Sequence, residues 1–153
     1  MNRANVPGAE LIPCKGVWNC DSVGHLPLAG LRMSSRNNIL MIDDNPVHLE
    51  IYRLILEKGG FIGLPALVTH NGLEFPEGEA VDAVLLDYRL APNISAYEVA
   101  TKVRARYPSV PIVILSDMYD PPADTAPLVQ GFVRKGNPEK LLSTLSELTR
   151  DLE

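Results

Sequence analysis

The sequence has few cysteines and no long hydrophobic run. Its two cysteines, Cys14 and Cys20, lie near the N-terminus, and two cysteines without a second pair are weak evidence for a zinc site. No run approaches the roughly 18 apolar residues that a membrane span needs. The N-terminal stretch also lacks the continuous apolar segment of a secretory signal. We therefore expect a cytoplasmic chain without membrane contact.

Basic residues are too few to favour a nucleic-acid binder. The 153 residues include 14 lysines and arginines against 19 aspartates and glutamates, a net charge of -5. A protein that binds nucleic acid usually carries a basic stripe, and no helix-turn-helix motif is found. A hydrophobic content of 46% is typical of a globular domain. These counts favour one acidic domain with no direct nucleic-acid partner.

Residues 1–36 differ in composition from the rest of the chain. They hold four basic and two acidic residues, whereas residues 37–153 hold ten basic and seventeen acidic residues. Prolines and glycines interrupt the first segment, and neither helical nor strand periodicity persists there. We expect residues 1–36 to be a disordered or loosely attached leader and residues 37–153 to form the domain. Met33 is a candidate for the true start of translation.

Short apolar runs predict the strands. A continuous apolar run is typical of a strand that is buried on both faces of a parallel sheet. A proline inside such a pattern, here Pro65, favours a position at the sheet edge. In chain order, strands are predicted at residues 39–42, 61–68, 83–86, 111–115 and 131–133.

Amphipathic stretches between these strands predict helices. Three clear helix starts are Asn45-Pro46, the capping box of Ser95 and Glu98, and Asn137-Pro138. Prolines allow at most a stunted helix at residues 71–80, and a short or absent one at residues 117–130. The alternation of strands and helices implies a parallel sheet with helices on both faces.

Four of the predicted strands end in polar or charged residues. These are Asp43 with Asp44, then Asp87, Ser116 and Lys135. Ligands of an open parallel sheet bind outside the carboxyl ends of its strands. Clustered carboxylates repel one another unless a cation relieves them, and such oxygen ligands suit Mg²⁺. A carboxylate beside Mg²⁺ can take a phosphoryl group, and lysine and hydroxyl groups can hold its oxygens.

Each of these residues has a simpler explanation when it is taken alone. Asp43 and Asp44 could cap the following helix and favour its positive end. Asp87 could be a turn residue, and Lys135 could be a solvated surface charge. Their coincidence at four strand ends favours one common site.

With these motifs, residues 37–153 resemble a response-regulator receiver domain, the flavodoxin-like module of two-component signalling. The matching stretches are residues 39–45, 84–90, 112–116 and 132–135. The resemblance implies a doubly wound α/β fold with five parallel strands in the order 2-1-3-4-5, here with shortened second and fourth helices. It implies a stand-alone, chemotaxis-regulator-like protein, as a monomer or weak dimer. Its partners would be a histidine kinase or phosphotransfer protein and an unknown downstream protein.

The resemblance also implies a metal site and an acceptor. Asp87 would be the phosphoacceptor. Asp44 and Asp87 would ligate Mg²⁺ directly, together with the backbone carbonyl of Arg89. Asp43 would act through a coordinated water.

Three further residues have roles implied by the resemblance. Ser116 and Lys135 would contact the phosphoryl group, and Phe132 would be the switch aromatic that swings inward as Ser116 closes. Such a domain accepts a phosphoryl group and sheds it by self-catalysed hydrolysis, and it is not a turnover enzyme.

The sequence departs from the family pattern around these residues. The loop after Asp87 is one residue longer, Asp117 replaces a small residue after Ser116, and Gly136 replaces a proline after Lys135. These differences leave open a pseudo-receiver that binds proteins without being phosphorylated. A Mg²⁺-dependent phosphatase would need a general acid at Arg89, and a guanidinium does not give up its proton. The curtailed fourth helix leaves the first or last helix as the surface for a partner.

Overall fold

The computed structural model describes residues 36–91 and 93–150. Apart from Arg36, the predicted leader lies outside these residues, and so do its two cysteines and Met33. No helix in the described part of the chain is long and apolar enough to cross a membrane. The elements in chain order are β1 (Asn38–Asp43), α3 (Pro46–Lys58), β2 (Ile62–Thr69), β3 (Gly72–Leu73), β4 (Ala83–Asp87), α4 (Ala96–Arg106), β5 (Ile112–Ser116), the 3-10 helix η2 (Ala126–Leu128), β6 (Gly131–Arg134) and α5 (Pro138–Arg150).

The strands form one sheet in the order β3-β2-β1-β4-β5-β6. The five longer strands pair in parallel, so the predicted order 2-1-3-4-5 is confirmed. A sixth strand, β3, was not predicted. It pairs antiparallel with the end of β2, where Val68 lies opposite Leu73 and Thr69 opposite Gly72.

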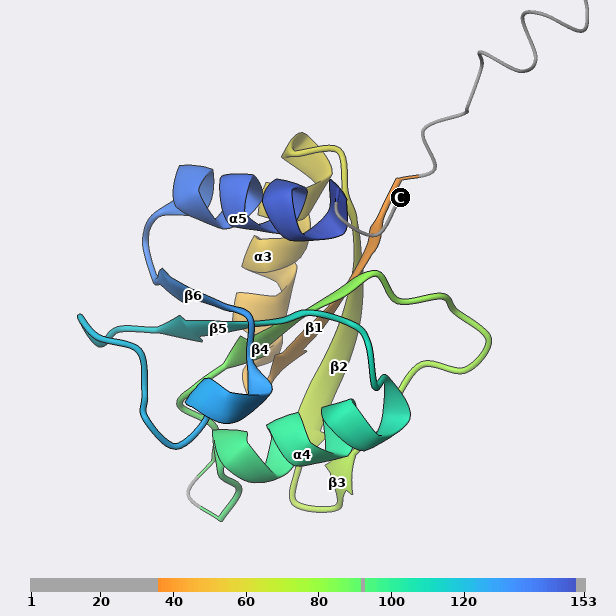
Figure 1. Ribbon diagram of the computed structural model, residues 1–153. Helices are drawn as coiled ribbons and strands as arrows, with labels where there is room; N and C mark the ends of the chain where they lie inside the picture. The colour runs from red at the N-terminus through yellow and green to blue at the C-terminus, as the bar shows by residue number, and fades with distance from the viewer. Residues whose placement is uncertain (1–35, 92, 151–153) are drawn as a thin grey trace, which may run out of the picture. The chain divides into compact units, whose positions relative to one another are not determined.

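Helices cover both faces of the sheet. Figure 1 shows α3 and α5 on one face and α4 on the other. Side chains of β1 alternate accordingly: Ile39 and Met41 pack in the cluster that includes residues of α3 and α5, whereas Leu40 and Ile42 pack in the cluster that includes residues of α4. All four are at most 1% exposed. Continuous apolar strands are therefore buried on both faces, and the flavodoxin-like α/β fold is confirmed.

The second and fourth helices are reduced, as the prolines in these segments predict. Residues 74–82 contain no helix, because Pro76 cannot continue a helical ladder and Gly78 adopts a left-handed φ of 78°. Between β5 and β6, three prolines leave only the three-residue η2. The face carrying α4 is therefore covered by one long helix and by loops.

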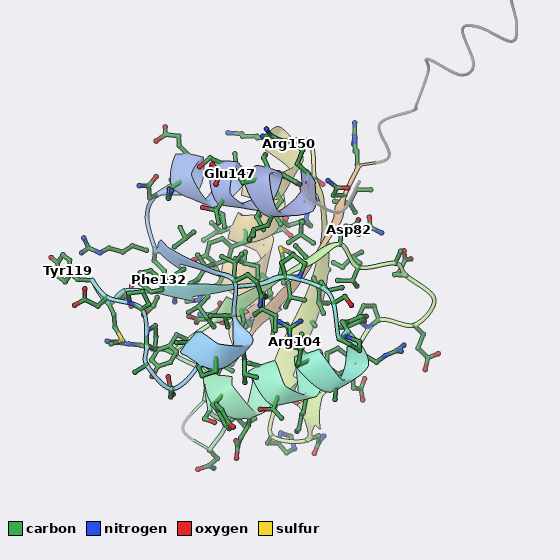
Figure 2. All side chains as sticks on the ribbon, viewed as in Figure 1. Asp82, Arg104, Tyr119, Phe132, Glu147 and Arg150 are labelled. Atoms are coloured by element: carbon green, nitrogen blue, oxygen red, sulfur yellow. The ribbon has the colours of Figure 1, made fainter. Side chains whose placement is uncertain are left out.

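Arg104 joins the loops that stand where the fourth helix is curtailed. Its Nη1 donates to the carbonyls of Pro108 at 3.0 Å and Val110 at 2.8 Å. Its Nη2 donates to the carbonyl of Leu128 at 2.7 Å and to Oε1 of Gln130 at 2.9 Å. The side chain thus ties α4 to the segments on either side of β5, and Figure 2 labels it on α4.

The predicted helix caps form. Asn45 accepts a hydrogen bond from the backbone N–H of Val47, and Pro46 is the first residue of α3. Ser95 and Glu98 form both hydrogen bonds of a capping box at the start of α4. These caps fix where α3 and α4 leave the carboxyl ends of β1 and of the loop after β4.

The apolar spacing of α3 includes residues that the sheet does not bury. Leu49 and Leu56 are the buried residues of this helix. Val47, Ile51 and Leu54, which follow a spacing of four and three residues, are 62%, 48% and 48% exposed. We call these three residues the α3 stripe. The buried residues of α3 pack in the core, whereas the exposed apolar residues of the α3 stripe could bind a partner.

Candidate functional site

The site lies where four neighbouring parallel strands end. Asp43 ends β1, Asp87 ends β4 and Ser116 ends β5, while Lys135 directly follows β6. Asp43, Asp87 and Ser116 are 2%, 3% and 0% exposed. The sheet thus holds the predicted residues at one edge, although buried charges are costly unless they are paired.

Asp87 is paired with Lys135. The Nζ of Lys135 lies 2.9 Å from Oδ1 of Asp87, and the backbone N–H of Arg89 donates to the same oxygen at 3.3 Å. The backbone N–H of Lys135 donates to the carbonyl of Ser116 at 2.9 Å, which fixes the start of the loop. Gly136 has a φ of 88°, so the turn after Lys135 uses a left-handed glycine. The ion pair between Lys135 and Asp87 therefore forms although Gly136 stands where the family usually has a proline.

Asp43 accepts hydrogen bonds from the first turn of α3. Its Oδ1 accepts from the backbone N–H of Asn45 at 2.9 Å, and its Oδ2 lies 3.1 Å from Nδ1 of His48. Burial raises the pKa of the Asp43 carboxyl, and the charge of Asp87 and the nearby Asp44 carboxyl raise it further. The hydrogen bond from Asn45 and the charge of His48 act in the opposite direction. The pair of buried carboxylates is thus under mutual repulsion.

Three side chains could hold a metal ion together. One ligand atom each of Asp43, His48 and Asp87 lies within 4.8 Å of the others. Two buried carboxylates under repulsion fit a hard divalent cation such as Mg²⁺. The predicted ligand Asp44 is partly buried and is not a member of this group of three. Among the described residues, the structure gathers Asp43 rather than Asp44 with Asp87.

Ser116 is fully buried, and its hydroxyl is oriented. The backbone N–H of Met118 donates to its Oγ at 3.1 Å. The hydroxyl proton of Ser116 therefore stays available to another acceptor. Asp117, a departure from the family pattern, is exposed to solvent.

Two residues of α3, His48 and Tyr52, belong to the site but were not predicted. They are four residues apart, so they lie on one face of the helix. Tyr52 lines a narrow space together with Asp43 and Asp87. Burial, followed by the charges of Asp87, Asp43 and Asp117, raises the pKa of Tyr52 to about 12. A usable signal was the i, i+4 pair of polar side chains in a helix that begins directly after strand-end aspartates.

Phe132 and the loop after β5 flank the site. Phe132 on β6 is partly buried and packs against the cluster on the α4 side. At the edge of the site, the guanidinium of Arg134 stacks 4.0 Å from the ring of Tyr119, which is 80% exposed. Figure 2 labels both Phe132 and Tyr119. On the other side, the hydroxyl of Tyr88 donates to Asp124 at 3.3 Å and links the loop after β4 to this segment.

Comparisons with known proteins agree with this fold. The sequence matches the family model of the response regulator receiver domain over residues 39–145. The chemotaxis protein CheY4 of Vibrio cholerae is 21% identical, with a TM-score of 0.62, over 74% of this chain and 99% of that chain. A CheY-like receiver domain from Methanospirillum hungatei JF-1 is 24% identical, with a TM-score of 0.65, over 76% of this chain and 96% of that chain.

A third similar structure comes from a signalling complex. A chain from the complex of the histidine kinase ThkA with the response regulator protein TrrA is 25% identical, with a TM-score of 0.62. The match covers 73% of this chain and 97% of that chain. Since the family model matches well over half of the sequence, the chain belongs to the response regulator receiver domains, the signalling modules of two-component systems.

Proposed function

We propose that this receiver domain accepts a phosphoryl group on Asp87 in the presence of Mg²⁺ and signals through contacts with other proteins. The observation that carries the proposal is the 2.9 Å ion pair between Nζ of Lys135 and Oδ1 of Asp87 at a buried strand end. A lysine there holds the acceptor carboxylate in place and can then bind a phosphoryl oxygen. Ser116, at the end of the neighbouring strand, offers a hydroxyl proton to a second oxygen.

The transfer follows from these positions. A carboxylate oxygen of Asp87 attacks the phosphorus of a phosphohistidine, so that a P–O bond forms while the P–N bond breaks. The electron pair of that bond returns to the imidazole nitrogen of the donor. Lys135 and Ser116 hold the equatorial oxygens, where negative charge is spread in the transition state.

The residues proposed to hold Mg²⁺ are Asp43, Asp44, Asp87 and the backbone carbonyl of Arg89. A bound Mg²⁺ would offset the charge that the carboxylates and the phosphoryl group bring together. Burial, and then the charge of Asp87, raise the pKa of the Asp43 carboxyl, and a cation bound between the two carboxylates would offset their repulsion.

Phosphorylation is proposed to be reversible and to be read by a partner. Water attacks the phosphorus of the aspartyl phosphate, which releases inorganic phosphate and restores the Asp87 carboxylate. The domain would thus reset itself and would not be a turnover enzyme. Phe132 lies on β6, one strand from Ser116, and we propose that it moves inward when Ser116 closes on the phosphoryl group. A cytoplasmic location and a monomeric or weakly dimeric state accompany this proposal.

The α3 stripe is the proposed docking surface for the phosphodonor protein. Its helix begins directly beside the site, since Asn45 and His48 both contact Asp43. A donor that lies on Val47, Ile51 and Leu54 therefore has its phosphohistidine near Asp87. The similar chain in a complex between a histidine kinase and a response regulator supports a kinase as this donor.

The acceptor is tested by replacing Asp87. We expect the full chain, incubated with Mg²⁺ and acetyl phosphate, to gain one phosphoryl group in an intact-mass measurement. Asp87→Asn abolishes this gain, because the amide is a far weaker nucleophile than the carboxylate. The exposed Asp117→Asn is the matched control and keeps the gain.

Two outcomes would contradict the acceptor assignment. An equal gain in Asp87→Asn would place the phosphoryl group elsewhere. No gain in the wild-type chain would favour the pseudo-receiver, which binds partners without being phosphorylated.

The donor surface is tested by replacing two apolar residues of the α3 stripe with serine. In the double variant Ile51→Ser with Leu54→Ser, we expect transfer from a histidine kinase that phosphorylates the wild type to slow about tenfold or more. Truncating a residue at the centre of an interface can cost about 2 kcal/mol, and a tenfold effect needs only about 1.4 kcal/mol. Uptake from acetyl phosphate stays unchanged, since this donor needs no docking. Tyr97→Ser, at an exposed aromatic on α4, is the control, and an equal loss there would refute the assignment.

A further inference from the structure

His48 stands at the metal site, although no role had been predicted for it. It is the third residue of α3, and its ring faces the carboxyl ends of the strands. Its Nδ1 lies 3.1 Å from Oδ2 of Asp43, and 42% of the side chain is exposed. The ring is therefore held at the site while its edge remains open to solvent.

The spacing of these atoms suits ligands that share one ion. Neighbouring ligand atoms around an octahedral ion with bonds of about 2.1 Å lie about 3 Å apart. The Nδ1 of His48 and Oδ2 of Asp43 share a hydrogen bond of 3.1 Å, and one oxygen of Asp87 lies within 4.8 Å of both, near the roughly 4.2 Å that separates opposite ligands of such an ion. The three side chains come from β1, α3 and β4, so the backbone fixes each of them separately.

An imidazole changes which ion such a site prefers. A site of oxygen ligands alone suits Mg²⁺, which binds nitrogen poorly, whereas imidazole suits Fe²⁺, Co²⁺, Ni²⁺ and Zn²⁺. The affinity of a site with nitrogen ligands rises from Mn²⁺ towards Ni²⁺. A histidine beside two carboxylates therefore favours a transition metal over Mg²⁺.

We propose that His48 is a direct nitrogen ligand of the metal at Asp43 and Asp87, and that it makes the site selective for divalent transition metals over Mg²⁺. The inference rests on the proposed function, because it concerns the same site. It deepens that function, since phosphorylation of Asp87 would then respond to the supply of a transition metal.

The direct test is spectroscopic. One equivalent of Mn²⁺ is added to the full chain, and electron spin-echo modulation reports whether an imidazole nitrogen is bound to the ion. We expect a nitrogen signal in the wild type, its loss in His48→Gln, and its retention in His70→Gln. His70 is an exposed histidine on the turn between β2 and β3, so it is a matched control.

Selectivity gives a second, independent readout. Calorimetric titrations with Ni²⁺ and with Mg²⁺ are compared for wild type and His48→Gln. We expect the ratio of Ni²⁺ to Mg²⁺ affinity to fall by about tenfold or more in the variant. Even residues that only form hydrogen bonds to a metal ligand change the metal affinity by about ten- to hundredfold. Both leader cysteines remain in the variant, so a difference arises from His48.

Several results would overturn this inference. They are a bound Mn²⁺ without a nitrogen signal, a signal that persists in His48→Gln, or an unchanged affinity ratio. In each case, phosphorylation of Asp87 with Mg²⁺ alone would leave the proposed function intact. If the wild type bound no divalent ion at all, both the inference and the proposed metal dependence would fail.

Discussion

Replacing Asp43 by asparagine will stabilise the metal-free domain and abolish its response to metal. Asp43 is 2% exposed, and it lies near the charge of Asp87 and the carboxyl group of Asp44. Its folded-state pKa is raised, so its contribution to stability is present at low pH and is lost as pH rises through that pKa. At neutral pH the buried charge is therefore a cost. Asp43→Asn removes it, and we expect a gain of about 1 kcal/mol in the free energy of unfolding.

Thermal unfolding in EDTA and in divalent metal measures both effects. The melting temperature of Asp43→Asn exceeds that of the wild type in EDTA, and the difference shrinks at acid pH, where Asp43 is protonated in any case. Added metal stabilises the wild type only. The exposed Asp120→Asn, in the loop after β5, is the control and changes little. A lower melting temperature for Asp43→Asn in EDTA would show that the buried charge is not a cost, and a retained response to metal would show that Asp43 does not hold the ion.

Removing Arg104 will cost more stability than any other change to the surface of α4. Its guanidinium donates to four loop acceptors at 3.0 Å or less, and no long helix covers this region. Hydrogen bonds from a charged donor contribute about 1.5–3 kcal/mol, part of which is lost to solvent because Arg104 is only partly buried. We expect Arg104→Ala to lower the free energy of unfolding by roughly 2 kcal/mol and the melting temperature by roughly 8–10 °C.

Two further variants separate the roles of shape and charge at this position. Arg104→Lys retains the charge but loses the planar fork, so most of the loss persists. Lys102→Ala, at an exposed position on the same helix, leaves stability within about 0.5 kcal/mol of wild type. Chemical denaturation of the three variants gives the comparison. Equal losses in Lys102→Ala and Arg104→Ala would show that Arg104 has no special role in holding the loops.

The parallel core could be predicted because its signals are local. Each buried strand is a short continuous apolar run, and each α-helix begins at a cap that the sequence displays, such as Ser95 with Glu98. The site followed from the same signals. Once the strands are parallel, Asp43, Asp87 and Ser116 must share one edge of the sheet.

What could not be predicted depends on contacts between distant segments. The two-residue β3 exists only because a turn at His70 and Asn71 returns the chain along β2, and no periodicity marks so short a strand. The apolar residues of α3 could not be sorted into buried and exposed faces without knowing where the sheet lies. His48 could not be predicted as a site residue because it contacts Asp43 from five residues further along the chain. A strand end, a helix cap and the first turn of α3 must all form before the two side chains meet.

Locating the modified residue tests most directly whether Asp87 carries the phosphoryl group. Borohydride reduces an aspartyl phosphate to homoserine, which peptide mass spectrometry can place in the sequence. After incubation with acetyl phosphate and divalent metal, we expect homoserine at position 87 and at no other aspartate. Homoserine elsewhere, or none in a chain that has bound metal, would contradict this expectation.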